Sequence, residues 1–544
     1  MNKDLESIQE ARDLAEAAFT AFQIFEHFTE EQVERVLAEI SNSGIAHAAA
    51  LAQIAVEETG YGTVQHKTLK NLFCARDVYN AIRPMKTVGI VSEDPEKKVF
   101  EVASPIGVIA AIIPSTNPTS TAIYKALIAL KGRNTIVFSP HPSAVKCIRE
   151  TSRLISEAAE RAGAPKNVIS CMKTPTLEGT EALMKHSRTS LILATGGTGL
   201  VKAAYSAGKP AYGVGPGNVP TYIESTADVP RAVRDILTGK TFDNGTLCSS
   251  EQSIVCDESV KDAALEQLRA QGAYICNPAE KALLEQIIQT PRRTLNTKIV
   301  GQAAEKIGAM AGFKVPSGTR AIVAHADGVG LMYPISMEKL SPLLAFYVVK
   351  DWQEGCARCI EILSFGGLGH TLSLHMREDR IVREFALKKP AFRICVNTPA
   401  ALGAVGYTTN LFPSMTLGCG AQGNNITSDN ISPLHLINLK RVAYGVREVE
   451  ASAPAARGII EKVVDQWLDR KQEKPPQQIA AAAPPLSSYK ELQPAAGKPV
   501  AFVCEDDVRI AIDSKSHIVL GRKTIVTPSA RELGEAHDVF VTAD

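Results

Sequence analysis

The sequence predicts an α/β protein built on parallel sheets that are covered by helices on both faces. Short apolar runs of strand length alternate along the chain with longer stretches whose apolar residues recur at helical spacing. Strands that are apolar along their whole length are typical of a parallel sheet, because such a sheet is buried on both sides. With 544 residues, of which 45% are hydrophobic and 22% charged, the chain is long enough for two or three domains with substantial cores.

The predicted elements follow one another in the order that this fold requires. The predicted strands, each bounded by Gly, Pro or Asn, are Val108–Ile113, Thr135–Phe138, Ser190–Leu193 and Pro220–Ile223. The predicted helices are Ser120–Leu130, Ala144–Ala162, Leu177–His186 and Leu200–Ala207. An amphipathic helix runs from Leu5 to Phe22. It either docks on the first sheet, which is the simpler expectation, or binds another protein.

Composition excludes several classes of function. A net charge of +1 gives no reason to expect nucleic acid or an anionic membrane surface as a partner. No apolar run reaches the length of a spanning helix, and the N-terminus lacks the pattern of a signal peptide. The 11 cysteines are odd in number and scattered, which fits reduced thiols in a cytoplasm. Cys356 and Cys359 form a single CxxC without further ligands, so no metal site is expected.

Cys248 is the candidate nucleophile. It lies in the segment Thr241-Phe-Asp-Asn-Gly-Thr-Leu-Cys-Ser-Ser-Glu-Gln252. A thiolate attacks an aldehyde carbon readily, and a polar loop near backbone amides is expected to lower the pKa of the thiol. Spacing alone leaves a second interpretation open, in which Cys248 is a packed apolar residue.

Two loops after predicted strands carry further chemistry. After Ile113, the loop Pro114-Ser-Thr-Asn-Pro-Thr-Ser120 offers Asn117, whose amide either stabilises an oxyanion or caps the following helix. After Leu193, the small residues Ala194-Thr-Gly-Gly-Thr-Gly199 lead into a helix, and a helix N-terminus favours a phosphate. Both loops are expected at the carboxyl edge of the sheet, where ligands bind in such folds.

Ordered strings over residues 5 to 445 resemble the aldehyde dehydrogenase superfamily. They most resemble its CoA-acylating branch, which includes one half of bifunctional aldehyde-alcohol dehydrogenases and related enzymes of bacterial microcompartments. The matching strings are Ser104-Pro-Ile-Gly-Val-Ile109, Ile113-Pro-Ser-Thr-Asn-Pro118, Ala194-Thr-Gly-Gly197, Gly213-Val-Gly-Pro-Gly-Asn218, Lys240-Thr-Phe-Asp-Asn-Gly245, Ser249-Ser-Glu-Gln252, Glu338-Lys-Leu-Ser-Pro342, Gly366-Gly-Leu-Gly-His-Thr371 and Pro413-Ser-Met-Thr-Leu-Gly-Cys-Gly420.

The resemblance implies a fold and a set of site residues. It implies a Rossmann-like dinucleotide-binding domain, an α/β catalytic domain and oligomerisation strands. Cys248 matches the nucleophile, and Asn117 with the Cys248 backbone N–H matches the oxyanion hole. Glu338 matches a carboxylate on the nicotinamide ribose. The expected cofactor-binding positions are Pro114, Ser115, Ser139, Pro140, His141, Thr195, Gly196, Gly197, Thr198, Gly213, Gly215 and Glu338.

Departures from the family pattern sharpen the expected reaction. Hydrolytic relatives carry a Glu in the loop that here reads Gly213-Val-Gly-Pro-Gly217, so the base that activates water is missing. The acceptor of the thioester is then expected to be coenzyme A. Ser139-Pro-His-Pro142 replaces a Lys-Pro-Ser-Glu string and supplies no basic residue for a 2′-phosphate, which favours NAD. His370 either accepts the CoA thiol proton or fixes its loop.

The expected function is oxidation of a short aliphatic aldehyde, propionaldehyde or acetaldehyde, to acyl-CoA with NAD. A hydrolytic aldehyde dehydrogenase and a catalytically silent scaffold or shell-interaction protein of the same fold are the alternatives. The predicted regions are a dinucleotide-binding domain over 1–235 with an oligomerisation hairpin near 95–105, a catalytic domain over 236–425, and a return segment with an oligomerisation strand over 426–470. A homodimer or homotetramer is expected.

The predicted C-terminal regions are a Pro/Ala/Gln-rich linker over 471–499 and an appendage over 500–544. In the appendage we expect a helix over Asp506–Ile512, a strand over Thr524–Val526 and a helix that Thr527 caps. A linker followed by such an appendage resembles the targeting tails of microcompartment enzymes. The appendage either binds a shell protein, with the enzyme in the compartment lumen, or packs on the oligomer as a small subdomain.

Overall fold

The protein is described by a computed structural model that covers residues 2–447, 453–472, 500–514 and 516–542. Contacts divide the chain into two units, Met1–Val446 and Arg447–Asp544. The first unit contains two parallel sheets and an antiparallel one, and the second contains a small parallel sheet. The predicted parallel α/β fold is confirmed.

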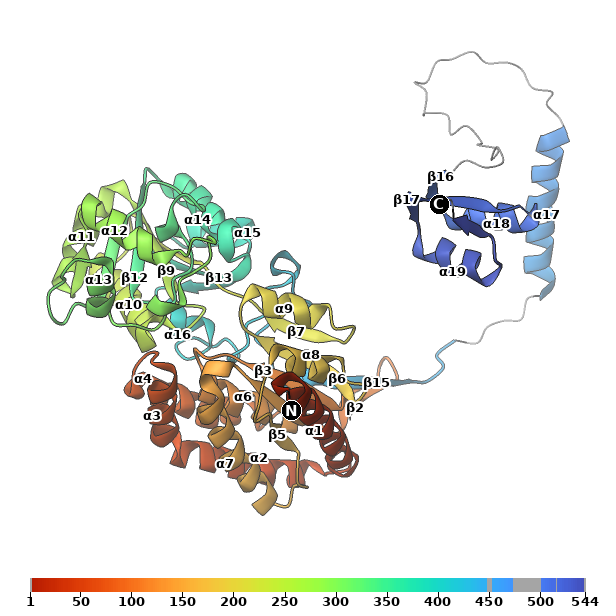
Figure 1. Cartoon of the computed structure of the whole chain (residues 1–544), viewed down its shortest axis with the longest axis horizontal. Helices are drawn as coiled ribbons and strands as arrows, with labels where there is room; N and C mark the ends of the chain where they lie inside the picture. The colour runs from red at the N-terminus through yellow and green to blue at the C-terminus, as the bar shows by residue number, and fades with distance from the viewer. Residues whose placement is uncertain (1, 448–452, 473–499, 515, 543–544) are drawn as a thin grey trace, which may run out of the picture. The chain divides into compact units, whose positions relative to one another are not determined.

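Five parallel strands form the first sheet of the N-terminal lobe (Figure 1). In the order β5-β4-β3-β6-β7 they are Ile169–Cys171, Thr135–Pro140, Val108–Ile113, Thr189–Thr195 and Ala211–Val214. Alternate residues of β3 enter different apolar clusters, Val108 on the side of helix α1 and Ile109 on the side of helix α6. Each face of the sheet is therefore buried, as its continuous apolar runs require.

Helices cover this sheet on both sides. The face toward α1 also packs against α8 and α9, and the opposite face packs against α6 and α7, which α2 covers in turn. The predicted docking of the N-terminal helix on this sheet is confirmed, since Ala11, Ala15 and Ala18 are fully buried. The helices of this lobe are α1 (Lys3–Phe25), α2 (Glu30–Ala46), α3 (Ala48–Thr59), α4 (Val64–Leu72), α5 (Tyr79–Ile82), α6 (Pro118–Lys131), α7 (Val145–Arg161), α8 (Leu177–Lys185) and α9 (Thr198–Tyr205).

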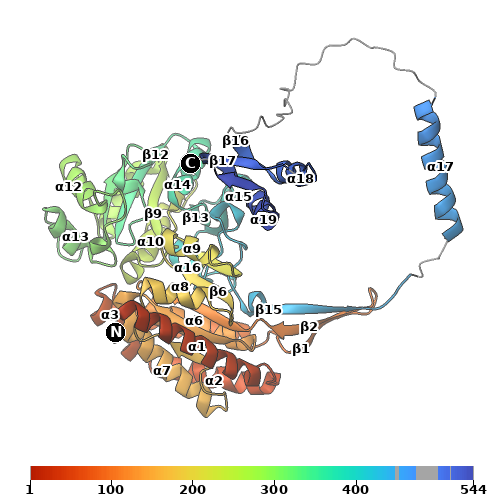
Figure 2. The ribbon, with the colours of Figure 1, turned by 45° about the vertical axis from the view of Figure 1, so that its right-hand side comes forward.

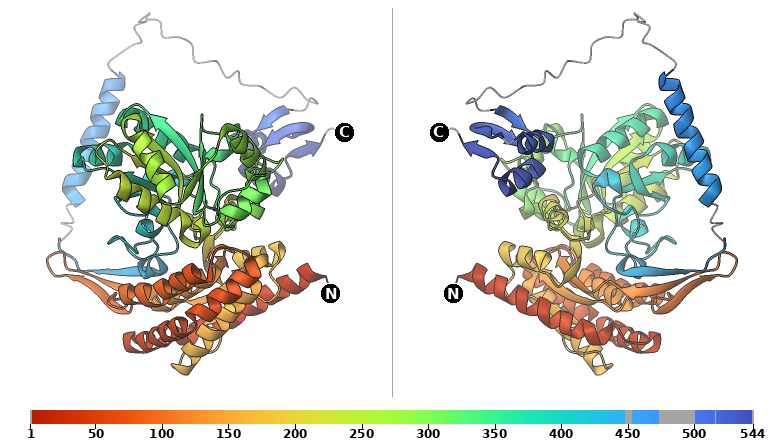
Figure 3. Two further views of the ribbon diagram at one scale, coloured as in Figure 1. Left: turned by 90° about the vertical axis from the view of Figure 1, so that its left-hand side faces the viewer. Right: turned by 90° about the vertical axis from the view of Figure 1, so that its right-hand side faces the viewer.

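Seven parallel strands form the sheet of a second lobe (Figure 3). In the order β10-β11-β12-β9-β8-β13-β14 they are Ala273–Ile275, Ala321–His325, Leu343–Val349, Glu251–Asp257, Val219–Ile223, Gly369–His375 and Ala391–Val396. One face packs on α10 and α11 and the other on α12 to α15. The helices of this lobe are α10 (Val229–Thr241), α11 (Lys261–Ala270), α12 (Pro278–Ile288), α13 (Ala304–Ala311), α14 (Trp352–Gly366), α15 (Asp379–Lys388) and α16 (Ala400–Ala404).

Three antiparallel strands, in the order β1-β2-β15, extend from the N-terminal lobe (Figure 2). They are Gly89–Asp94, Val99–Pro105 and Ile437–Ala443. Because β15 pairs with β2 along its whole length, a segment late in the chain returns to the N-terminal lobe. Exposed apolar side chains on these strands include Ile90, Leu439 and Val442.

The C-terminal unit contains a helix that was not predicted. It is α17 (Ala453–Gln472), and it begins within the predicted return segment 426–470. Apolar residues at positions 460, 463, 464, 467 and 468 give this helix one apolar stripe. Most of the predicted linker, 473–499, lies outside the described residues.

The predicted helix over 506–512, strand over 524–526 and Thr527-capped helix are confirmed within α18, β17 and α19, whereas β16 and β18 were not predicted. Thr527 caps α19 by accepting a hydrogen bond from the backbone N of Ala530, with Pro528 as the first helical residue. The elements are β16 (Val500–Val503), α18 (Glu505–Asp513), β17 (Ile518–Val526), α19 (Pro528–Ala536) and β18 (Phe540–Thr542). In the part of the chain that the structure describes, no helix combines the length and the apolar character needed to cross a membrane.

Candidate active site

Cys248 lies in the tight loop formed by the 3₁₀ turn Phe242–Gly245 and the residues that join it to β9. Three successive residues of this loop have a left-handed backbone, with φ of 50° at Asp243, 53° at Asn244 and 75° at Gly245. Asp, Asn and Gly adopt this conformation at the least cost, so the sequence suits the turn. The loop holds the Cys248 side chain half-buried against the apolar cluster of the N-terminal lobe.

The environment of Cys248 corrects one expectation. The pKa of the thiol is raised to about 12, mainly by burial and in part by Glu338 and Cys419, with Arg393 opposing them. The predicted lowering is therefore wrong, because the apolar cluster and a neighbouring carboxyl group outweigh the backbone hydrogen bond that favours the thiolate. The thiol is protonated at neutral pH, so its attack on a carbonyl group must be coupled to loss of its proton.

Asn117 occupies the N-cap position of α6, but its side chain does not cap the helix. Its Nδ2 donates to the backbone oxygen of Thr246 at 3.3 Å, and its Oδ1 accepts from Nζ of Lys70 at 2.5 Å. Thr246 is two residues from Cys248 in the chain. The helix-cap interpretation is therefore wrong, and the amide faces the loop that carries the nucleophile.

Gly217 brings the acid-free loop 213–217 against both Cys248 and His370. A Cβ atom on Gly217 would lie 2.4 Å from the carbonyl oxygen of Cys248 and 2.9 Å from Cγ and Nδ1 of His370. No side chain fits at this position unless its neighbours move. The backbone N of Gly217 donates to Oε1 of Glu338 at 2.9 Å, and burial raises the pKa of Glu338 to about 8.

His370 is fully buried and uncharged. Its Nδ1 lies 2.9 Å from Oγ1 of Thr371, and its buried Nε2 has no hydrogen-bond partner among the described residues. Burial, together with the nearby guanidinium of Arg393, lowers the pKa of His370 to about 3. If Nδ1 carries the proton, then the Nε2 lone pair is available to accept one.

Arg393 is a site residue that the sequence interpretation missed. From β14 its Nη2 donates to the backbone oxygens of Gly369, at 3.2 Å, and of Gly418. These two residues directly precede His370 and Cys419, so one guanidinium ties together the loops that carry them. The available signal was an Arg between apolar neighbours in the run Ala391-Phe-Arg-Ile-Cys-Val396.

The predicted cofactor positions other than Glu338 lie at the carboxyl ends of neighbouring parallel strands. The strand order reverses direction at β3, whose neighbours are β4 and β6, and such a switch point is where ligands bind in open α/β sheets. Pro114 and Ser115 follow β3. Strand β4 ends with Ser139 and Pro140, and His141 follows it. Strand β6 ends with Thr195, and Gly196, Gly197 and Thr198 lead into α9; Gly213 lies in β7 and Gly215 follows that strand.

The individual side chains at this edge differ in what they offer. Thr195 has a buried hydroxyl without a hydrogen-bond partner among the described residues, and Gly197 stands at the uncapped N-terminus of α9 with open space beside it. Ser139 instead turns its buried hydroxyl to Thr180 Oγ1 at 2.7 Å, so it packs against α8. The backbone N of Gly213 donates a hydrogen bond to the hydroxyl of Tyr205 at 3.0 Å.

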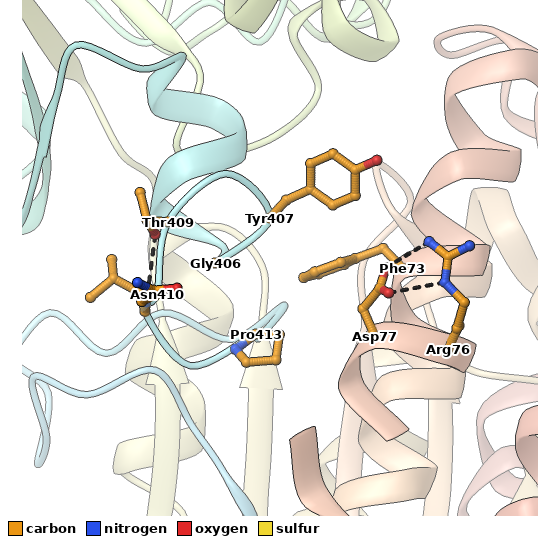
Figure 4. Close-up of a pocket in the computed structure, with 9 residues that line it drawn as sticks. Phe73, Arg76, Asp77, Gly406, Tyr407, Thr409, Asn410 and Pro413 are labelled. Atoms are coloured by element: carbon orange, nitrogen blue, oxygen red, sulfur yellow. Dashed lines mark hydrogen bonds and ion pairs between the residues drawn. The ribbon is translucent and has the colours of Figure 1, made fainter. Parts of the chain in front are cut away.

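A surface cavity of about 390 Å³ lies apart from these residues (Figure 4). Phe73 and Tyr407 meet edge to face in it, with ring centroids 5.7 Å apart, and an Arg76–Asp77 ion pair lines the same wall. Its lining includes none of the predicted site residues. The candidate active site is therefore the arrangement around Cys248.

The fold and this site define a class of protein. Residues 2–296 match the sequence profile of the aldehyde dehydrogenase family. The chain belongs to the aldehyde dehydrogenase family, as the motifs around Cys248 predict.

Particular relatives identify the branch. A solved acetylating aldehyde dehydrogenase from Geobacillus thermoglucosidasius is 53% identical, with a TM-score of 0.81 over 82% of this chain and 99% of that one. The bifunctional aldehyde-alcohol dehydrogenase of Escherichia coli K12 is 43% identical over 80% of this chain and 50% of its own length. The chain thus spans about half the length of the curated relatives that it matches first.

Two further solved structures are propionaldehyde dehydrogenases. One comes from the fucose utilisation microcompartment of Clostridium phytofermentans, with 29% identity and a TM-score of 0.72 over 80% of this chain and 97% of that one. The other, from Rhodopseudomonas palustris, contains bound CoA and an acylated cysteine, with 27% identity and a TM-score of 0.72 over the same shares.

Proposed function

We propose that the protein is a CoA-acylating aldehyde dehydrogenase that oxidises a short aliphatic aldehyde, propionaldehyde or acetaldehyde, with NAD through a Cys248 thioester. The observation that carries the proposal is the contact at Gly217. The glycine lies against both the Cys248 carbonyl oxygen and the ring of the neutral, buried His370. It belongs to the loop in which hydrolytic relatives carry their water-activating Glu. A thioester formed here has no such base, so a thiol is the fitting acceptor.

Acylation begins when Cys248 adds to the aldehyde carbonyl carbon. The sulfur–carbon bond forms as the S–H bond breaks, the proton passes to water, and the carbonyl electron pair moves onto oxygen to give an oxyanion. The Nδ2 group of Asn117 and the backbone N–H of Cys248 are the donors for that oxyanion. The nicotinamide ring, when bound, accepts the hydride that leaves the same carbon, and a thioester remains on Cys248.

The edge of the first sheet fits a dinucleotide. The unpartnered hydroxyl of Thr195 and the uncapped first turn of α9 at Gly197 are donors suited to phosphate oxygens. The position of Glu58 supports NAD rather than NADP as the cofactor. Its carboxylate accepts hydrogen bonds from the backbone N of Lys146 and of Cys147, both at 2.7 Å, at the N-terminus of α7. That negative charge, beside the end of β4, would repel a 2′-phosphate.

Thioester cleavage by CoA needs a proton acceptor for the thiol. We assign this role to His370, whose neutral imidazole offers an unpartnered Nε2 next to the Gly217 loop. Because its pKa is lowered to about 3, His370 is a weak base, so it takes the proton only in concert with formation of the new sulfur–carbon bond. The proton moves from the CoA sulfur to Nε2 as the sulfur attacks the thioester carbon, and Cys248 leaves.

Trapping the intermediate tests this chemistry. Enzyme mixed with NAD and propionaldehyde, without CoA, should gain the mass of one propionyl group, carried on Cys248 in the peptide map. Adding CoA should remove that mass and release propionyl-CoA. A Cys248→Ala variant with unchanged far-UV circular dichroism is the control. An enzyme that forms NADH without ever carrying an acyl group would contradict the thioester route.

We also propose that the protein works as a homo-oligomer. The strands β1, β2 and β15 expose Ile90, Leu439 and Val442, at 55%, 37% and 39%. Apolar side chains on an extended antiparallel sheet fit a symmetric interface between copies. Light scattering should give a dimer or tetramer for the wild type and a smaller species for Leu439→Asp. An unchanged mass for this variant would contradict an interface at β15.

Residues 447–544 are our candidate for a segment that associates with a microcompartment shell protein, with the enzyme in the lumen. Exposed apolar side chains in this unit support the proposal: Ile460 and Val463 on α17, and Phe502 and Ile525 on the small sheet. Deleting 447–544 should leave kcat and KM within about two-fold and abolish co-sedimentation with shells. Retained co-sedimentation, or loss of activity, would contradict a targeting role.

A further inference from the structure

Three charged side chains that the proposed reaction does not use are buried beside Asn117. Lys67 and Lys70, one helical turn apart on α4, are 2% and 3% exposed, and Asp243 in the Cys248 loop is fully buried. Both ammonium groups contact Oδ2 of Asp243, Lys67 at 2.9 Å and Lys70 more closely. Charges are rarely buried without a partner, and here each has one.

The two lysines differ in their second partner. Lys67 Nζ donates to the backbone oxygen of Thr116 at 3.0 Å, whereas Lys70 Nζ donates to Oδ1 of Asn117 at 2.5 Å. Burial lowers the pKa of Lys70 to about 7 and the Asp243 carboxylate opposes that shift, so the ammonium form is favoured below neutral pH. An ammonium group has only donors, so in that form the atom of Asn117 that it contacts must be the carbonyl oxygen. This contact fixes which way the carboxamide points, and leaves Nδ2 to donate to Thr116 Oγ1 at 3.2 Å and to the Thr246 carbonyl oxygen, in the Cys248 loop, at 3.3 Å.

We propose that Lys70 is a positioning residue that holds the Asn117 carboxamide with its NH₂ group toward the reacting carbonyl oxygen and strengthens that group as a donor. A cation on the amide oxygen draws electron density from the amide nitrogen, so its N–H bonds become more polar. Donors fixed before the reaction stabilise an oxyanion without paying for reorientation when charge develops.

Asp243 anchors Lys70 for this role. Burial alone would raise the pKa of Asp243, but the ammonium groups of Lys70 and Lys67 outweigh that effect and hold the pKa below its usual value. Oδ1 of Asp243 also accepts from the backbone N of Thr63 at 2.9 Å, next to the start of α4. The carboxylate thus joins α4 to the loop of the nucleophile, so that Lys70, Asn117 and Cys248 keep one geometry.

Lys67 provides a matched control, because Lys67→Met and Lys70→Met each remove one buried ion pair with Asp243, but only Lys70→Met removes the contact with Asn117. The inference rests on the proposed aldehyde oxidation, so the readout is the single-turnover rate of NADH formation from propionaldehyde. Melting temperatures of all variants report the structural cost. Each substitution is made in the wild type and in Asn117→Ala.

We expect Lys70→Met to slow NADH formation by about 10- to 100-fold in the wild-type background, and by less than about three-fold on Asn117→Ala, because its effect passes through that amide. Lys67→Met should stay within about three-fold in both backgrounds, with a comparable loss of melting temperature. Lys70→Gln, which keeps a neutral donor, should fall between Lys70→Met and wild type, and serves in the same cycle if Lys70→Met does not fold.

Equal slowing by the two methionine variants, or an undiminished effect of Lys70→Met on Asn117→Ala, would overturn the inference and leave Lys70 a purely structural residue. A wild-type enzyme that forms no NADH from aldehyde would instead overturn the proposed function. The two failures are therefore distinguishable in one experiment.

Discussion

The two flanks of Cys248 are built from opposite kinds of groups. On the flank of Asn117, two lysines and an aspartate are buried in direct contact and fix an amide donor. On the flank of Gly217, a loop without acidic residues and a neutral imidazole face the same residue. Charged side chains hold the donor for the oxyanion, whereas the loop in which hydrolytic relatives carry their Glu has no acidic residue, and the charged group beside His370, the Arg393 guanidinium, is a cation. The difference indicates a site that forms the thioester readily and favours a thiol over water as the acceptor of its acyl group.

Removing the residue between the flanks should have the largest effect. Cys248→Ala should lower the turnover of aldehyde to acyl-CoA by at least about 10⁴-fold, because the covalent route depends on that sulfur. Steady-state assays of NADH and acyl-CoA would measure this loss. Cys419→Ala is the control, since Cys419 is buried beside Arg393 and we expect it to pack rather than react. Comparable losses in the two variants would contradict a single nucleophile.

Removing the His370 imidazole, on the Gly217 side of Cys248, should slow the transfer of the acyl group to CoA without slowing acylation. His370→Ala should slow the CoA-dependent step by about 10²-fold or more, the usual contribution of a positioned base, and should change acylation by less than about three-fold. Rapid-mixing experiments that start from isolated acyl-enzyme separate the two steps. An unchanged transfer rate would leave His370 only the role of fixing its loop.

Filling the contact at Gly217 should disturb both flanks at once. The Cβ atom of Gly217→Ala would overlap the Cys248 carbonyl oxygen and the His370 ring. A displacement of about 1 Å in an active site costs about 10²-fold in rate, so we expect losses of that order in acylation and in transfer. Gly458→Ala, where a Cβ atom meets nothing within 4 Å, is the control. A fully active Gly217→Ala would show that the close approach at this loop is dispensable.

The smallest expected effect concerns pH. With a pKa lowered to about 3, His370 is uncharged at pH 7 and stays so down to about pH 4. Lowering the pH from 7.5 to 5.5 should therefore cost less than about two-fold in the thiol-transfer rate through this residue. An imidazole with the ordinary pKa of about 6.5 would lose about nine-tenths of its neutral form over that range. A transfer rate that falls with a midpoint near pH 6.5 would contradict a buried, neutral His370.

The sequence was informative where chemistry is local. The apolar runs predict β3 and β4 closely, and the turn Ala194–Gly199 predicts the start of α9. The Asn117 side chain was left with two interpretations, because capping and oxyanion binding use the same residue type at the same spacing. Only its contacts with Lys70 and Thr246 decide between them.

Long-range contacts carried the features that sequence patterns missed. Lys70 and Asp243 are 173 residues apart in the chain, and each has the appearance of a surface charge when considered alone. The pKa of Cys248 depends on packing against a cluster drawn from many elements, which a polar local sequence does not reveal. Helix α17 was missed although its apolar residues from Ile460 to Leu468 recur at helical spacing.

The most direct test of the contrast between the flanks is the dependence of NADH formation on CoA. Purified protein, NAD and propionaldehyde should give at most about one NADH per active site without CoA, and continuous turnover with propionyl-CoA as the product once CoA is added. Sustained NADH formation without CoA, with propionate as the product, would contradict the account, because water would then be the acceptor of the thioester.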